Sequence, residues 1–93
     1  MQIIERSKAF KKDYKREIKG KYREILDSVL LPVLHDLVNE RILDQRYKDH
    51  QLIGNWSGYR ECHLKPDLLL IYKHTQNKII LLARLGSHAK IFN

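Results

Sequence analysis

The chain has 93 residues, 43% of them hydrophobic, and its 18 Lys and Arg residues against 11 Asp and Glu residues give a net charge of +7. This length indicates one domain, residues 1–93, and the composition argues against disorder. The single cysteine, Cys62, excludes an intrachain disulfide framework, and without an export signal or a long apolar run we expect a cytoplasmic protein with no membrane contact.

The first predicted elements are a short strand over residues 2–6 and a helix that begins after Ser7, a residue type that caps helices well. Phe10, Tyr14 and Ile18 recur every four residues on one face of this helix, and Gly20 is placed to end it. The opposite face carries six basic residues, namely Lys8, Lys11, Lys12, Lys15, Arg16 and Lys19. Such a face is either simply solvated or a contact for phosphates or a partner, with Lys11 and Lys12 as candidate phosphate ligands.

A second helix is predicted over residues 22–38 from its apolar stripe. Pro32 lies within the stripe and removes one backbone hydrogen bond, so we expect a kink there or a break into two helices. Residues 39–57 show no clear periodicity, and residues 54–58, with the sequence GNWSG, are typical of a loop.

Three strands are predicted in the second half, over residues 59–65, 68–74 and 78–85. Pro66 cannot donate to a strand ladder and is expected at a strand boundary, while Asn77 is suited to a left-handed position in the turn at residues 75–77. The predicted fold is therefore α+β, in the order β-α-α-β-β-β, with two N-terminal helices packed on a small, mostly antiparallel four-stranded sheet.

Histidines and a carboxylate stand at the edges of these elements: His50, His63, Asp67 and His88. Strand alternation places Tyr59, Glu61, His63 and Lys65 on one face. That face is too polar for a core, so we expect His63 to point into solvent or a cleft.

These residue types suit cleavage of an RNA backbone by its own 2′-hydroxyl. That reaction needs a base, an acid and positive charge beside the phosphate, but no metal ion. Histidine suits both proton transfers because its reference pKa, about 6.5, is close to cellular pH. Arg84 could supply the fixed charge, and Phe92 or Tyr59 a surface on which a base stacks.

Other interpretations of the same residues remain open, since any single histidine here could be an ordinary surface residue. A zinc site is disfavoured because the sequence has no His-x₃₋₅-His pair and no helical His-Glu motif, so we expect no metal and no cofactor. A serine nucleophile at Ser87 beside His88 is disfavoured because adjacent residues of an extended segment point apart.

Three segments of the second half, in order, carry a resemblance to a known family: residues 49–56 read DHQLIGNW, residues 59–73 read YRECHLKPDLLLIYK, and residues 84–92 read RLGSHAKIF. Together they resemble the YafQ-type branch of the RelE/ParE superfamily of bacterial toxins. Weaker similarity lies at residues 10–15. The sequence departs from the family at Leu68, where relatives often carry an aromatic residue.

The resemblance implies a ribosome-dependent endoribonuclease that cuts mRNA in the decoding site, and an antitoxin protein as its partner. The family's functional positions correspond to His50, His63, Asp67, His88, Arg84 and Phe92. By analogy, His88 and Asp67 are candidates for proton transfer, while His50 and His63 orient the phosphate or share those transfers. Which residue is the base and which the acid stays open.

The remaining expectations concern binding and rival functions. Lys65 is a further candidate contact for RNA phosphates, and the free toxin is expected to be a monomer. One alternative is a ParE-like toxin of the same fold that inhibits DNA gyrase and cuts no RNA. Another is a basic nucleic-acid-binding module without catalysis.

Overall fold

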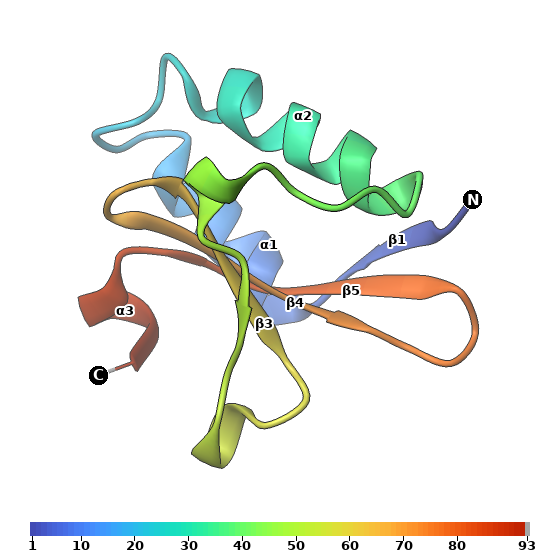
Figure 1. Ribbon diagram of the computed structural model, residues 1–93. Helices are drawn as coiled ribbons and strands as arrows, with labels where there is room; N and C mark the ends of the chain where they lie inside the picture. The colour runs from blue at the N-terminus through green and yellow to red at the C-terminus, as the bar shows by residue number, and fades with distance from the viewer. Residues whose placement is uncertain (93) are drawn as a thin grey trace.

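The computed structural model describes residues 1–92 and shows one sheet with two helices on one side and a short third helix near the C-terminus (Figure 1). The strands are β1 (Ile3–Arg6), β2 (His50–Gln51), β3 (Arg60–Lys65), β4 (Leu68–His74) and β5 (Ile79–Gly86). The helices are α1 (Lys8–Glu17), α2 (Leu26–Val38) and α3 (His88–Phe92), with 3-10 turns η1 (Gln45–Tyr47) and η2 (Gly54–Trp56).

The sheet has the strand order β1-β5-β4-β3-β2. Only β1 and β5 pair in parallel, and the three other pairs are antiparallel. The predicted α+β fold is thus confirmed, but the sheet has five strands where four were predicted. The additional strand, β2, has only two residues, both exposed, and so carries no hydrophobic alternation that a sequence pattern could reveal.

Helix α1 begins at the predicted cap, because the Ser7 hydroxyl accepts the N–H of Phe10 at 2.9 Å. The same hydroxyl donates to the Ala83 carbonyl at 2.8 Å, which attaches the start of α1 to β5. The helix ends at Glu17, three residues before Gly20.

Helix α2 is one continuous helix with Pro32 inside it, so the predicted break into two helices is wrong. Pro32 removes the partner of the Ser28 carbonyl, and both residues lie on the exposed side of the helix. Water can therefore satisfy that carbonyl, and burial of Leu26, Leu30 and Val33 on the other side holds the helix together.

The two faces of the sheet carry separate cores. On one face, α1 and α2 cover a large core that includes Phe10, Val33, Cys62, Leu70 and Leu82. The other face carries a smaller core in which four buried residues pack with four half-buried ones: Leu69, Ile71, Ala83 and Ile91, with Leu52, Trp56, Tyr59 and Phe92. The small core leaves part of its face uncovered.

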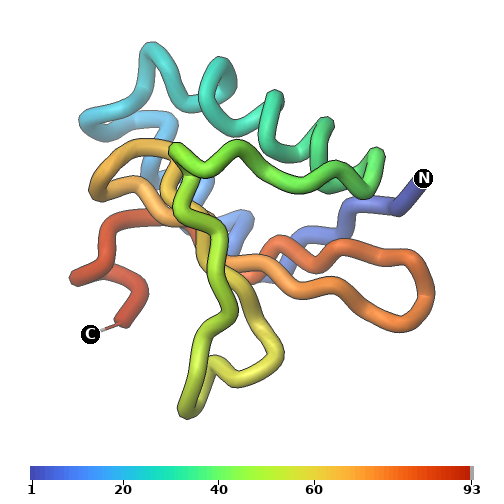
Figure 2. Tube along the Cα trace, in the orientation of Figure 1, coloured from blue at the N-terminus to red at the C-terminus, as the bar shows by residue number. Residues whose placement is uncertain are grey.

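Two connections complete the fold. Figure 2 shows the segment after α2 running back along that helix toward its N-terminal end before it turns into β2. In the β4–β5 connection the left-handed residue is Lys78, with φ 58°, and not Asn77 as predicted. The connection has one residue more than predicted, and because the Thr75 N–H donates to the Ile79 carbonyl, residues 76–78 form a three-residue turn, whose left-handed residue comes last. No helix formed by residues 1–92 is long and apolar enough to span a membrane.

Candidate functional site

His50 and His63 meet at one buried carboxylate. The β2–β3 pairing sets His50 opposite Glu61, and His63 follows Glu61 by two residues on the same face of β3. Glu61 Oε1 lies 3.0 Å from His63 Nε2 and 3.9 Å from His50 Nε2. The two ring centroids are 6.5 Å apart. The Glu61 side chain is 8% exposed, whereas the side chains of His50 and His63 are 52% and 26% exposed.

Backbone carbonyls hold the opposite side of each ring. His50 Nδ1 lies 2.8 Å from the Lys48 carbonyl, and His63 Nδ1 lies 3.4 Å from the Pro66 carbonyl. The Nδ1 of each ring therefore faces a backbone carbonyl, while the Nε2 of His63 lies close to Glu61 and that of His50 lies farther from it.

Asp67 and His88 form a second pair, at the β3–β4 turn and at the start of α3. The His88 backbone N–H donates to Asp67 Oδ1 at 3.2 Å. Both side chains are exposed, and the His88 ring lies 4.8 Å from the ring of Phe92. Phe92 also contacts Trp56, at a centroid distance of 6.0 Å.

The sheet register makes the two pairs neighbours. Leu69 faces His63 on β3 and Gly86 on β5, so the three form one row across the sheet. Adjacent strands are about 4.8 Å apart, which puts the backbones of His63 and Gly86 roughly 10 Å apart. The Pro66 carbonyl that His63 contacts belongs to the peptide bond leading into Asp67. The four residues thus come together at one end of the sheet, on the face that α1 and α2 leave free.

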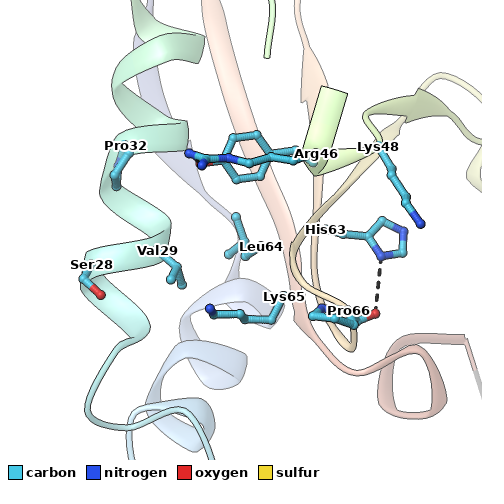
Figure 3. A pocket seen from close by; sticks show the side chains of 10 residues that line it. Ser28, Val29, Pro32, Arg46, Lys48, His63, Leu64, Lys65 and Pro66 are labelled. Atoms are coloured by element: carbon cyan, nitrogen blue, oxygen red, sulfur yellow. Dashed lines mark hydrogen bonds between the residues drawn. The ribbon is translucent and has the colours of Figure 1, made fainter. Parts of the chain in front are cut away.

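Lys65 does not share the face of His63, so the predicted alternation is wrong at this position. A bulge between His63 and Lys65 sets Lys65 opposite Leu68, whose side chain belongs to the core under the helices. Figure 3 shows the result, with Lys65 reaching toward α2 and His63 directed away from it.

Arg84 is held by Asp13, a buried carboxylate of α1. Its Nε lies 2.7 Å from Asp13 Oδ2, and its side chain is 24% exposed. Asp13 also accepts from Arg16 Nη1 at 2.8 Å and from the Leu85 N–H at 2.9 Å. Burial alone would raise the pKa of Asp13, but these hydrogen bonds outweigh it and lower the pKa. Arg84 thus shares its charge with this cluster, which sits where α1 meets β5.

The predicted lysine contacts on α1 lie apart from the histidines. Lys11 and Lys12 are exposed on the helix, which packs on the opposite face of the sheet. Phe92, in contrast, lies beside His88, where a stacking surface was expected.

Glu61 is the site residue that the candidate set from the sequence lacks. Alternation placed it on the face of His63, but its contact with His50 depends on β2, which the sequence pattern does not reveal.

Asp49 anchors that short strand, since it accepts hydrogen bonds from Arg60 and from the hydroxyl of Tyr72. Burial and the hydrogen bond to Asp49 raise the pKa of Tyr72, so its hydroxyl stays a donor.

The same geometry bears on metal binding. Within residues 1–92 no three side chains of His, Cys, Asp or Glu are grouped closely enough to hold a metal ion together. The predicted absence of a metal remains a prediction.

Comparisons with known proteins identify the family of this chain. Residues 2–93 match the family described as YafQ, bacterial toxin of type II toxin-antitoxin system. The mRNA interferase toxin YafQ of Escherichia coli K12 is 37% identical over 92 residues, covering 97% of this chain and 99% of that protein.

Solved structures show the same fold. A metal-bound toxin from Helicobacter pylori has a TM-score of 0.88 and 43% identity, covering 99% of this chain and all of that one. YafQ in the E. coli DinJ–YafQ complex has a TM-score of 0.85 and 38% identity, and the match covers both chains fully. The chain therefore belongs to the YafQ family of bacterial toxins of type II toxin-antitoxin systems.

Proposed function

We propose that this toxin is an endoribonuclease that cuts mRNA in the decoding site of the ribosome and so stops translation. The observation that carries the proposal is the pair of imidazoles joined by Glu61, beside His88 and Asp67, on a sheet face that the two large helices leave free. The naming of an E. coli relative as an mRNA interferase supports the same class of reaction.

The chemistry we propose is transfer of the phosphate to the neighbouring 2′-hydroxyl. A base removes the 2′-hydroxyl proton, the 2′-oxygen bonds to phosphorus, and an acid protonates the 5′-oxygen as its bond to phosphorus breaks. The products are a 2′,3′-cyclic phosphate and a 5′-hydroxyl, and no metal ion takes part. His88 and Asp67 are the first candidates for these proton transfers, with His50 and His63 orienting the phosphate or sharing them.

Other residues support this reaction without exchanging protons. Glu61 orients the imidazole of His63 and carries negative charge near that of His50, and the half-buried ring of Phe92 offers a surface for a base beside His88. An open site of this kind suits an enzyme whose substrate is already held in position by the ribosome, since orientation supplies a large part of catalysis.

We further propose a cognate antitoxin protein as the partner that keeps the toxin inactive, and a monomeric toxin in its absence. The related E. coli toxin forms such a complex with DinJ. Action on ribosomes places the toxin in the cytoplasm.

The proposal is tested in a reconstituted translation reaction with the full-length toxin. We expect cleavage of ribosome-bound mRNA to leave 2′,3′-cyclic or 3′-phosphate ends, and to fall by at least about 10²-fold in His88→Ala and His63→Ala. Chelation of metal should have no effect beyond its effect on the ribosome. A 3′-hydroxyl product formed only with magnesium would contradict the chemistry, and inhibition of gyrase without RNA cleavage would favour the ParE-like alternative.

A further inference from the structure

A cavity of about 470 Å³ lies between α2 and the end of β3, next to the candidate site (Figure 3). Pockets that hold small molecules have volumes of about 300–1,000 Å³, so this one can hold a group of that size. Its apolar wall consists of Val29 and Pro32 from α2 and Leu64 from β3.

The charged side chains that line the cavity are all basic. Arg46, Lys48 and Lys65 all line the cavity, and no carboxylate does. None of the three forms an ion pair with a carboxylate of residues 1–92. The Arg46 guanidinium lies 4.8 Å from the ring centroid of Tyr47 and donates to its hydroxyl at 2.9 Å, which holds this planar group in place.

The cavity is continuous with the candidate catalytic residues. His63 is part of its lining, and the Lys48 carbonyl is the group that orients the ring of His50. Lys48 has a left-handed backbone with φ 49°, which is costly for a residue with a side chain. That conformation turns the chain from η1 into β2 while Lys48 itself lines the cavity near His63 (Figure 3).

We propose that this cavity binds a nucleotide of single-stranded RNA next to the cleaved phosphodiester. Lys48 and Lys65 bind its phosphate, and its base lies along the apolar wall against the planar guanidinium of Arg46. This inference rests on the proposed ribonuclease function. An acidic protein segment would be attracted by the same charges, but the candidate catalytic residue His63 is itself part of the lining, so a nucleotide next to a phosphodiester held at His63 would lie beside the cavity, which favours RNA.

The test uses an RNA that cannot be cleaved, a 2′-O-methyl pentaribonucleotide, and the full-length toxin. Its affinity is measured from 50 to 200 mM salt for the wild type and for the double variant Lys48→Gln/Lys65→Gln. Each phosphate contact on single-stranded nucleic acid adds about 0.7 to the slope of log affinity against log salt. Because both lysines bind the same phosphate, the double variant should lower that slope by about 0.7, and backbone NMR shifts of Val29 and Leu64 caused by the RNA should disappear.

The matched control is Lys8→Gln/Lys78→Gln. It removes the same charge from two exposed lysines outside the cavity, and Lys78 has a left-handed φ of 58°, like Lys48. Equal slopes for the two double variants would overturn the proposal. The proposal would also be overturned if Lys48→Gln/Lys65→Gln lost antitoxin binding but kept its RNA binding, because the cavity would then bind an acidic protein. Since the 2′-O-methyl RNA is never cut, its binding to the cavity is measured independently of mRNA cleavage. A toxin that cuts no mRNA and a cavity that binds no RNA would therefore be distinguished.

Discussion

Glu61 is the one buried carboxylate, among the described residues, that contacts two of the candidate catalytic imidazoles. It lies 3.0 Å from His63 Nε2, while its own side chain is largely removed from water. A buried carboxylate has a cost in solvation, and here it places negative charge against the ring of His63 and near the ring of His50.

We predict that Glu61→Gln lowers the rate constant for mRNA cleavage by about 10²-fold and leaves KM nearly unchanged. Glutamine fills the same space but lacks the charge that both imidazoles face. The measurement is steady-state cleavage on programmed ribosomes, with thermal unfolding as the check on folding. Glu5→Gln, at an exposed position of β1, is the control. Cleavage by Glu61→Gln at the wild-type rate would show that Glu61 has no part in orienting the site.

Asp13 is expected to contribute to the stability of the folded protein in a pH-dependent way. Its pKa is lowered in the folded protein, because hydrogen bonds from Arg84, Leu85 and Arg16 outweigh the effect of burial. The stability that it contributes is present above the unfolded pKa of about 3.9 and is lost as the pH falls through the folded pKa.

Asp13→Asn should lower the free energy of unfolding by about 3 kcal/mol at pH 7, since two arginines lose a buried partner. The loss relative to wild type should shrink below about pH 4, where the Asp13 carboxyl begins to protonate in the unfolded chain but not yet in the folded one. Urea denaturation of both proteins from pH 3 to pH 7 measures this. If the free energies of unfolding of the two proteins differed by the same amount from pH 3 to pH 7, the charge of Asp13 would not be the cause of the difference.

At the scale of elements, the contact between α1 and the end of β5 positions the candidate residue His88. Arg16 Nη2 donates to the Leu85 carbonyl at 2.9 Å, directly over Gly86. A Cβ at Gly86 would lie 2.6 Å from that same nitrogen, and the residue has φ +154°. The positive φ therefore favours glycine here, two residues before His88, and a larger residue would also have to displace the end of the Arg16 side chain.

Gly86→Ala should destabilise the fold by about 1–3 kcal/mol and lower cleavage more than that loss explains, because the segment leading to His88 must move. Gly54→Ala is the matched control, since Gly54 also has a positive φ, +69°, but a Cβ there would meet nothing within 4 Å. Urea denaturation and cleavage assays on both variants separate backbone strain from displacement. Equal effects on cleavage would mean that the Arg16 contact does not position His88.

The elements also show which features a sequence pattern can predict. Helix α1 and strands β3, β4 and β5 were predictable because each carries a cap or a hydrophobic period of adequate length. Strand β2 and helix α3 were not, since they have two and five residues. The bulge that turns Lys65 toward α2 breaks the alternation without any Gly or Pro in the strand to mark it.

For the whole molecule, the candidate site depends on strand neighbours that are far apart in sequence. His50, His63 and His88 lie on or beside β2, β3 and β5, and the order of those strands in the sheet makes them neighbours. The residues themselves were identified by family resemblance, whereas Glu61 beside His50 and His63, and Asp13 beside Arg84, required the structure. Leu68, the departure from the family noted in the sequence, is fully buried under the helices, so that change concerns packing.

The most direct test of the account is to map the 5′ ends of cellular mRNA after brief induction of the toxin. We predict new ends inside translated reading frames, at one fixed position within codons, for the wild type and none for His88→Ala. Blocking translation before induction should abolish them. Growth arrest by the wild type without such ends, or equal cleavage of untranslated RNA, would contradict a ribosome-dependent nuclease built on these residues.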